Sequence, residues 1–157
     1  MLHTLHVRRT LRPDVAVSGQ NAWHGGCGAF TGEVAAEQLH DAGCAWVLLG
    51  HSERRTFSHE SNSYVADKVR HAQDAGLSVL ACVGETLAQR QAGEALATVD
   101  EQMRAVAEHI KCVRVCATVS LPPHADDLFH LQVLRPLPGG GLRAGVGHRD
   151  GADGDAG

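Results

Sequence analysis

Residues 46–55 read WVLLGHSERR, an apolar run followed at once by polar and charged side chains. The run Trp46–Leu49 is typical of a buried strand, and His51 then lies at the carboxyl end of that strand, where α/β folds place their chemistry. If residues 52–55 begin a helix, the positive end of its dipole favours a neutral imidazole at His51, which can donate a hydrogen bond to a developing oxyanion. The alternative is an ordinary loop histidine, one of 11 in the chain.

Two further apolar runs make this strand one of a series. The runs begin at residues 15, 46 and 77, so that they recur every 31 residues, and we expect strands at 15–17, 46–49 and 77–82. The segments between them have helical patterns that end at Gly43 and Gly76, where glycine can take the left-handed conformation. Repeated βα units predict a parallel sheet covered by helices, either an open doubly wound sheet or part of a (β/α)8 barrel.

Helix limits can be placed from caps and apolar spacing. We expect one helix to carry Glu33 in its first turn, one to begin at the Ser61 and Asn62 caps, and a short turn at 86–92. The clearest helix has one apolar stripe that should pack on the sheet, formed by Leu96, Val99, Met103, Val106 and Ile110. Residues 1–14 and 112–157 show no such period, and we expect irregular segments there.

The next strand repeats the arrangement of the first. Cys82 ends the run at 77–82, and Glu85 follows it by three residues. Glu85 is therefore expected at the same edge of the sheet as His51. The alternative is a buried cysteine followed by a turn glycine and a helix-start glutamate. The glycines at 25, 26 and 28 lack the spacing of a dinucleotide fingerprint, and a flexible loop explains them better.

Composition excludes several classes of protein. The chain has 157 residues, of which 43% are hydrophobic, enough for one core. A net charge of -4, from 14 basic and 18 acidic residues, argues against nucleic acid as a partner. No apolar run is long enough for a membrane span. The five cysteines and 11 histidines show no metal-ligand spacing, so we expect no metal site. No cofactor is expected either.

Three strings resemble one known family. SGQNAWHGGCGAFTGEVAAEQLHDAG at 18–43, WVLLGHSERR at 46–55 and LACVGETL at 80–87 are similar, in order and spacing, to triosephosphate isomerase. The resemblance covers residues 11–110. It implies a partial (β/α)8 barrel made of the third to fifth βα units, and an enzyme of glycolysis and gluconeogenesis that interconverts dihydroxyacetone phosphate and glyceraldehyde 3-phosphate.

The resemblance also implies roles for single residues. His51 matches the histidine that polarises the substrate carbonyl, and triosephosphate isomerase is the standard example of a neutral histidine held at a helix N-terminus. Ser52 and Glu53 match positions that line the same pocket, while Cys82 and Glu85 match a supporting thiol and carboxylate. Residues 20–33 match the loop by which each subunit of a homodimer reaches the other, with its tip at Phe30, Thr31, Gly32 and Glu33.

Several parts of the family pattern have no counterpart in the printed sequence. No lysine or asparagine matching the family's first strand precedes residue 11, and the family's base, a glutamate in a motif resembling AYEPVWAIGTG, does not appear. A full barrel needs about 250 residues, whereas three units supply part of one. We therefore expect a truncated and catalytically incomplete isomerase chain, or else a non-catalytic fragment that docks on a full-length isomerase subunit through residues 20–33.

The end of the chain does not resemble the family. We expect residues 111–157 to be a disordered, non-family tail. Residues 141–157 can be encoded so that the same bases, read one position later, give AYEPVWAIGTGLTATP, which is the missing glutamate segment out of frame. This indicates a frameshifted exon preceded by retained intervening sequence. The cytoplasm is the expected compartment, although plastid members of the family share the same motifs.

Overall fold

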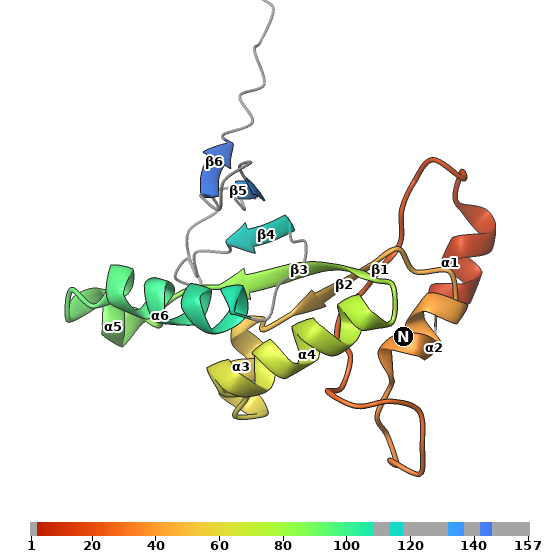
Figure 1. Ribbon diagram of the computed structural model, residues 1–157, viewed down its shortest axis with the longest axis horizontal. Coiled ribbons are helices and arrows are strands. Elements are labelled where there is room, and N and C mark those ends of the chain that lie inside the picture. The colour runs from red at the N-terminus through yellow and green to blue at the C-terminus, as the bar shows by residue number, and fades with distance from the viewer. Residues whose placement is uncertain (1–2, 109–113, 118–131, 137–141, 146–157) are drawn as a thin grey trace, which may run out of the picture.

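A computed structural model of the chain describes residues 3–108, 114–117, 132–136 and 142–145. Its strands form one sheet in chain order (Figure 1). Four strands run parallel to one another: β1 (Ser18–Gly19), β2 (Trp46–Leu49), β3 (Ser78–Val83) and β4 (Arg114–Ala117). The sheet continues with two antiparallel strands, β5 (Gln132–Pro136) and β6 (Leu142–Gly145).

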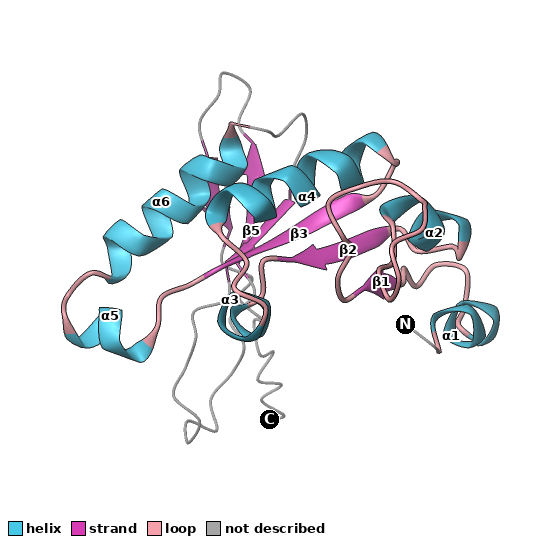
Figure 2. Cartoon of the chain, turned by 90° about the horizontal axis from the view of Figure 1, so that it is seen from below, coloured by secondary structure: helices cyan, strands magenta, loops and turns pink. Residues whose placement is uncertain are grey.

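One helix precedes the first strand, and the other described helices connect the parallel strands that follow. In chain order they are α1 (Thr4–Thr10), α2 (Ala36–Asp41), α3 (Ser52–Phe57), α4 (Asn62–Asp74), α5 (Leu87–Gln91) and α6 (Ala95–Ala107). The two longest, α4 and α6, lie side by side on one face of β2 and β3 (Figures 1 and 2). This is the arrangement of consecutive βα units that the sequence predicts.

Local chemistry explains the limits of α4. The Ser61 hydroxyl accepts a hydrogen bond from the Tyr64 N–H at 3.1 Å and so caps the first turn. The helix ends before Gly76, whose φ of +86° is readily available only to glycine. The predicted helix between Ser61 and Gly76 is therefore confirmed.

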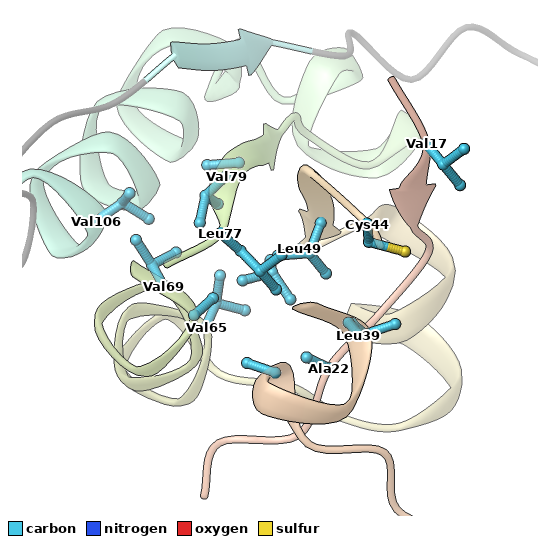
Figure 3. Packing of buried hydrophobic residues seen from close by; sticks show 14 residues of the cluster. Val17, Ala22, Leu39, Cys44, Leu49, Val65, Val69, Leu77, Val79 and Val106 are labelled. Atoms are coloured by element: carbon cyan, nitrogen blue, oxygen red, sulfur yellow. The ribbon is translucent and has the colours of Figure 1, made fainter. Parts of the chain in front are cut away.

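The core lies between the sheet and its helices. Val47 and Leu49 of β2 and Val79 of β3 are at most 1% exposed, and they pack with Val65 and Val69 of α4 (Figure 3). Alternate positions differ, since Leu48 and Leu80 are half-buried and Ser78 is exposed. Because side chains alternate between the faces of a strand, the second face of this sheet is covered less well than the helix face.

Two predicted limits need correction. The first strand is at Ser18–Gly19, not at 15–17, since the Val15 carbonyl accepts a hydrogen bond from the Arg8 guanidinium and so is occupied outside the sheet. The helix expected to include Glu33 begins at Ala36 instead, and the Ala35 N–H is capped by the Gln38 side chain at 2.9 Å. Glu33 lies in the preceding loop and is exposed.

The segments expected to be irregular also differ. Residues 4–10 form the short helix α1, which has no apolar stripe by which the sequence could predict it. Residues 114–117, 132–136 and 142–145 form strands. The other residues of the 111–157 segment lie outside the described part, and its assignment as a separate tail stays a prediction.

The helix expected to pack a full apolar stripe does so only in part. Val106 is buried and Met103 packs against the core, but Leu96 is 86% exposed. The reason is that α5 and the first turns of α6 extend past the end of β3 (Figure 1). Ile110 lies outside the described residues.

Candidate functional site

His51 is placed by the strand before it and the helix after it. It follows β2 by two residues and is the N-cap residue of α3, where its Nδ1 accepts a hydrogen bond from the Glu53 N–H at 3.3 Å. A nitrogen that accepts a hydrogen bond carries no proton, so Nε2 holds the proton of the neutral ring and is its donor. A helix does begin at Ser52, which is the condition set in the sequence analysis, and His51 lies at its N-terminus.

The Glu53 side chain offers Nδ1 a second interaction. Its Oε2 lies 3.5 Å from Nδ1, which would be an ion pair if that nitrogen were protonated. Both contacts cannot form at once, because Nδ1 either accepts or donates. We assign the cap, since the carboxylate is 75% exposed and 3.5 Å is long for a charged hydrogen bond. Ser52 and Glu53 are both exposed at the start of α3.

Gly50 allows the backbone to turn sharply between β2 and His51. Its φ is +76°, and a methyl group added to it would lie 2.9 Å from Val65 Cγ1 and 3.0 Å from the Cys82 carbonyl oxygen. The ends of β2 and β3 therefore meet at this glycine with no room for a side chain. Arg55 closes the turn from behind, because its Nε donates to the Gly50 carbonyl at 2.9 Å.

Arg55 is held between two elements. Its Nη1 donates to Asn62 Oδ1 at 2.7 Å, which ties α3 to the start of α4. Burial lowers the pKa of the Arg55 guanidinium, and the negative charge of Glu60 offsets part of this effect. Arg55 therefore connects the turn at Gly50 to the start of α4.

Cys82 and Glu85 lie at the neighbouring strand end. Cys82 is buried in β3, and Glu85 accepts a hydrogen bond from Arg90 Nε at 2.7 Å. Burial would raise the pKa of the Glu85 carboxyl, but the hydrogen bonds from Arg90 and from its own backbone outweigh this effect and lower it. Glu85 is thus held as a charged structural group.

Gln102 holds the turn between those two residues. Its side-chain amide donates to the Gly84 carbonyl at 2.9 Å and accepts from the Gly84 N–H at 2.8 Å. This polar residue is buried on α6, on a helix for which the sequence indicated only apolar packing. The turn before Glu85 is therefore held by a side chain 18 residues further along the chain.

The sequence prediction missed a buried ionic network. Glu60 Oε1 accepts from Lys68 Nζ at 2.6 Å and from Arg54 Nε at 2.9 Å, and Lys68 Nζ also donates to Asn21 Oδ1 at 2.9 Å. The side chains of Glu60 and Lys68 are each 1% exposed. Burial lowers the pKa of the Lys68 ammonium, and the hydrogen bond to Glu60 offsets part of that. A lysine one helical turn from the apolar Ala72 was the available signal.

The loop at 20–33 is folded against α4. Inside it, the Trp23 N–H donates to the Val34 carbonyl at 3.0 Å and the Glu33 N–H donates to the Phe30 carbonyl at 3.0 Å. Phe30 is 49% exposed, and Thr31, Gly32 and Glu33 are exposed beside it. The predicted tip residues therefore lie together on the surface.

Strands β1 to β4 thus form successive parallel βα units, and polar residues follow the carboxyl ends of the neighbouring strands β2 and β3, which is the architecture of an α/β protein. A sequence model described as Triosephosphate isomerase matches residues 1–119, so the chain belongs to that family, and the predicted partial (β/α)8 barrel is confirmed as its fold class. The match extends past both ends of the predicted range 11–110 and includes β4.

Curated relatives agree with the family. The chain is 51% identical over 105 residues to a cytosolic triosephosphate isomerase of Oryza sativa subsp. japonica, covering 67% of this chain and 42% of the relative. Over 100 residues it is 50% identical to the enzyme of Yarrowia lipolytica and 46% identical to that of Saccharomyces cerevisiae, covering in both cases 64% of this chain and 40% of the relative. The chain therefore spans about two fifths of the length of these relatives.

The described residues contain neither a cluster of metal ligands nor a helix suited to crossing a membrane. No group of three or more histidine, cysteine, aspartate or glutamate side chains in that part of the chain is placed to hold a metal ion. None of the helices described there is long and apolar enough to cross a membrane.

Proposed function

We propose that this chain carries the carbonyl-polarising part of a triosephosphate isomerase site, centred on His51. The proposal depends on one observation, the hydrogen bond from the Glu53 N–H to His51 Nδ1, which leaves the Nε2–H as the donor. A neutral Nε2–H at a strand end can stabilise the oxyanion that develops when a triose phosphate is enolised. Ser52 and Glu53 belong to the first turn of α3 beside His51, and the proposed supporting residues are Cys82 in β3 and Glu85 just after it.

We further propose that the chain does not turn over triose phosphates by itself. The printed sequence offers no counterpart of the family's lysine, which binds substrate, or of its base glutamate. Glu85 does not replace the base, because Arg90 holds it as a carboxylate with a lowered pKa, whereas an effective base has a pKa near the working pH. No cofactor enters this chemistry, since it needs only proton transfer and hydrogen bonding.

The purified chain should therefore show no isomerase turnover above buffer in a coupled assay. Loss of general-base catalysis alone is worth roughly 10² to 10⁴ in rate. Nitrogen NMR of the histidine rings, assigned with His51→Gln, should show the Nε2–H tautomer at His51. Turnover that His51→Gln abolishes would contradict the incompleteness, and an Nδ1–H tautomer would contradict the role of the Glu53 cap.

The exposed loop tip supports a second candidate function. Phe30 and Thr31 are presented on the surface by a loop whose backbone is closed on itself by the Trp23–Val34 and Glu33–Phe30 hydrogen bonds. A chain with this loop intact could dock on a full-length isomerase subunit, either as a non-catalytic partner or as half of a homodimer. The proposed compartment is the cytoplasm, in line with the name of the rice relative.

Docking can be measured directly. Co-expression of the tagged chain with a full-length isomerase should recover the complex, and Thr31→Arg should lower the recovery because it places a bulky cation at the tip. Arg104→Gln on the exposed face of α6 is the matched control that also changes one charge. Equal recovery of all three chains, or of none, would exclude docking through this tip.

A further inference from the structure

The loop at 20–33 contacts α4 at two points one helical turn apart. The Lys68 ammonium donates to Asn21 Oδ1 at 2.9 Å, and the His24 ring meets the Tyr64 ring edge-on with 4.8 Å between their centroids. Tyr64 and Lys68 are four positions apart in the sequence and so share one face of α4. Lys68 Nζ also lies 5.0 Å from the centroid of the Tyr64 ring.

From Tyr64 a series of ring contacts leads to the loop tip. His24 lies next to Trp23 with 4.9 Å between the ring centroids, and Trp23 packs on Phe30 with 4.1 Å between theirs. The Trp23 indole N–H also donates to the Gly26 carbonyl at 3.2 Å. The rings of Tyr64, His24, Trp23 and Phe30, which we call the aromatic latch, therefore connect a helix to the exposed tip.

We propose that Tyr64 is a positioning residue, which fixes the tip of the loop for docking on another isomerase subunit by holding the aromatic latch. The proposal rests on the docking function above and deepens it. Its physical basis is preorganisation, because a loop already held in its bound shape loses less conformational entropy on binding. Tyr64 is the one latch residue outside the loop, so that it links the tip to the folded core.

Two variants separate the ring of Tyr64 from its hydroxyl. Tyr64→Phe keeps the edge contact with His24, whereas Tyr64→Leu keeps an apolar side chain and loses the ring. An aromatic pair contributes roughly a two- to tenfold change in an equilibrium constant. We therefore expect Tyr64→Leu to weaken docking by about two- to tenfold and Tyr64→Phe to leave it unchanged.

The latch has a readout that needs no partner. In the unaltered chain the His24 ring protons, assigned with His24→Gln, should be shifted in the NMR spectrum by the ring current of Tyr64. The part of this shift that comes from Tyr64 should persist in Tyr64→Phe and be lost in Tyr64→Leu, where the part that comes from the Trp23 ring remains. The methyl signals of the core residues Val47 and Val79 should stay in place in both variants. Phe57→Leu, which removes an aromatic ring that is 80% exposed on α3, is the control and should change neither.

The outcomes separate this proposal from the docking function. If His24 shows no shift in the unaltered chain, or the same shift in Tyr64→Leu, the aromatic latch is wrong. If Tyr64→Leu disturbs the core, His24→Gln removes the same contact from the exposed side, together with the contact to Trp23, and should weaken docking at least as much. If the shift depends on Tyr64 but the unaltered chain and Tyr64→Leu dock with equal affinity, the positioning role is overturned and docking stands. If the shift depends on Tyr64 and no chain docks, the docking function fails, and with it this role of Tyr64.

Discussion

Replacing Glu60 with glutamine should lower the free energy of unfolding by about 3–5 kcal/mol, the usual cost of breaking a buried ion pair from one side. Glu60 Oε1 accepts from both Lys68 and Arg54, and the Lys68 side chain is 1% exposed. The glutamine keeps the shape of the side chain but leaves the ammonium buried without a counter-charge. Urea denaturation followed by circular dichroism would measure the change in the midpoint.

Two further variants test the explanation. Glu60→Gln combined with Lys68→Met should recover part of the loss, because the buried charge is then removed together with its partner. Asp100→Asn removes a carboxylate from the exposed pair with Arg104 and should leave the midpoint unchanged. Equal effects of Glu60→Gln and Asp100→Asn would show that burial does not strengthen the Glu60 network.

Replacing Gly50 with alanine should destabilise the chain by about 2–5 kcal/mol. One part of this cost, about 1–2 kcal/mol, comes from a φ of +76° in a residue with a Cβ. The other part, about 1–3 kcal/mol, comes from overpacking, since the new methyl group would lie 2.9 Å from Val65 Cγ1 and 3.0 Å from the Cys82 carbonyl oxygen. Relief of that contact would move His51, which should lose its Nε2–H tautomer signal in the nitrogen NMR spectrum.

Gly93 provides a matched control for the backbone part. Its φ is +77°, almost the same as that of Gly50, and a methyl group added there meets nothing within 4 Å. Gly93→Ala should therefore cost only about 1–2 kcal/mol, and the difference between the two variants measures the steric part. If both variants have the same denaturation midpoint, the close approach of β2 and β3 at Gly50 is not an energetic constraint.

Periodic features of the sequence were sufficient to predict the repeated units. The caps at Ser61 and Asn62 and the glycine at Gly76 are local signals, which depend on residues only a few positions apart. The 31-residue interval joins apolar runs that are each recognised locally. For the same reason the position of His51 at a strand end and a helix start could be predicted from residues 46–55 alone. The strand at 18–19 was missed because the competing partner of the Val15 carbonyl, Arg8, belongs to another element.

The sequence by itself therefore determined the βα order, the family and the place of His51 along the chain. Only the tertiary structure decided that Lys68 is buried against Glu60 and Asn21, that Gln102 holds the turn at Gly84, and that Leu96 is exposed. The physical reason is that burial depends on which elements meet. A lysine on a helix looks solvated until a carboxylate eight residues away and an amide 47 residues away are brought to its ammonium.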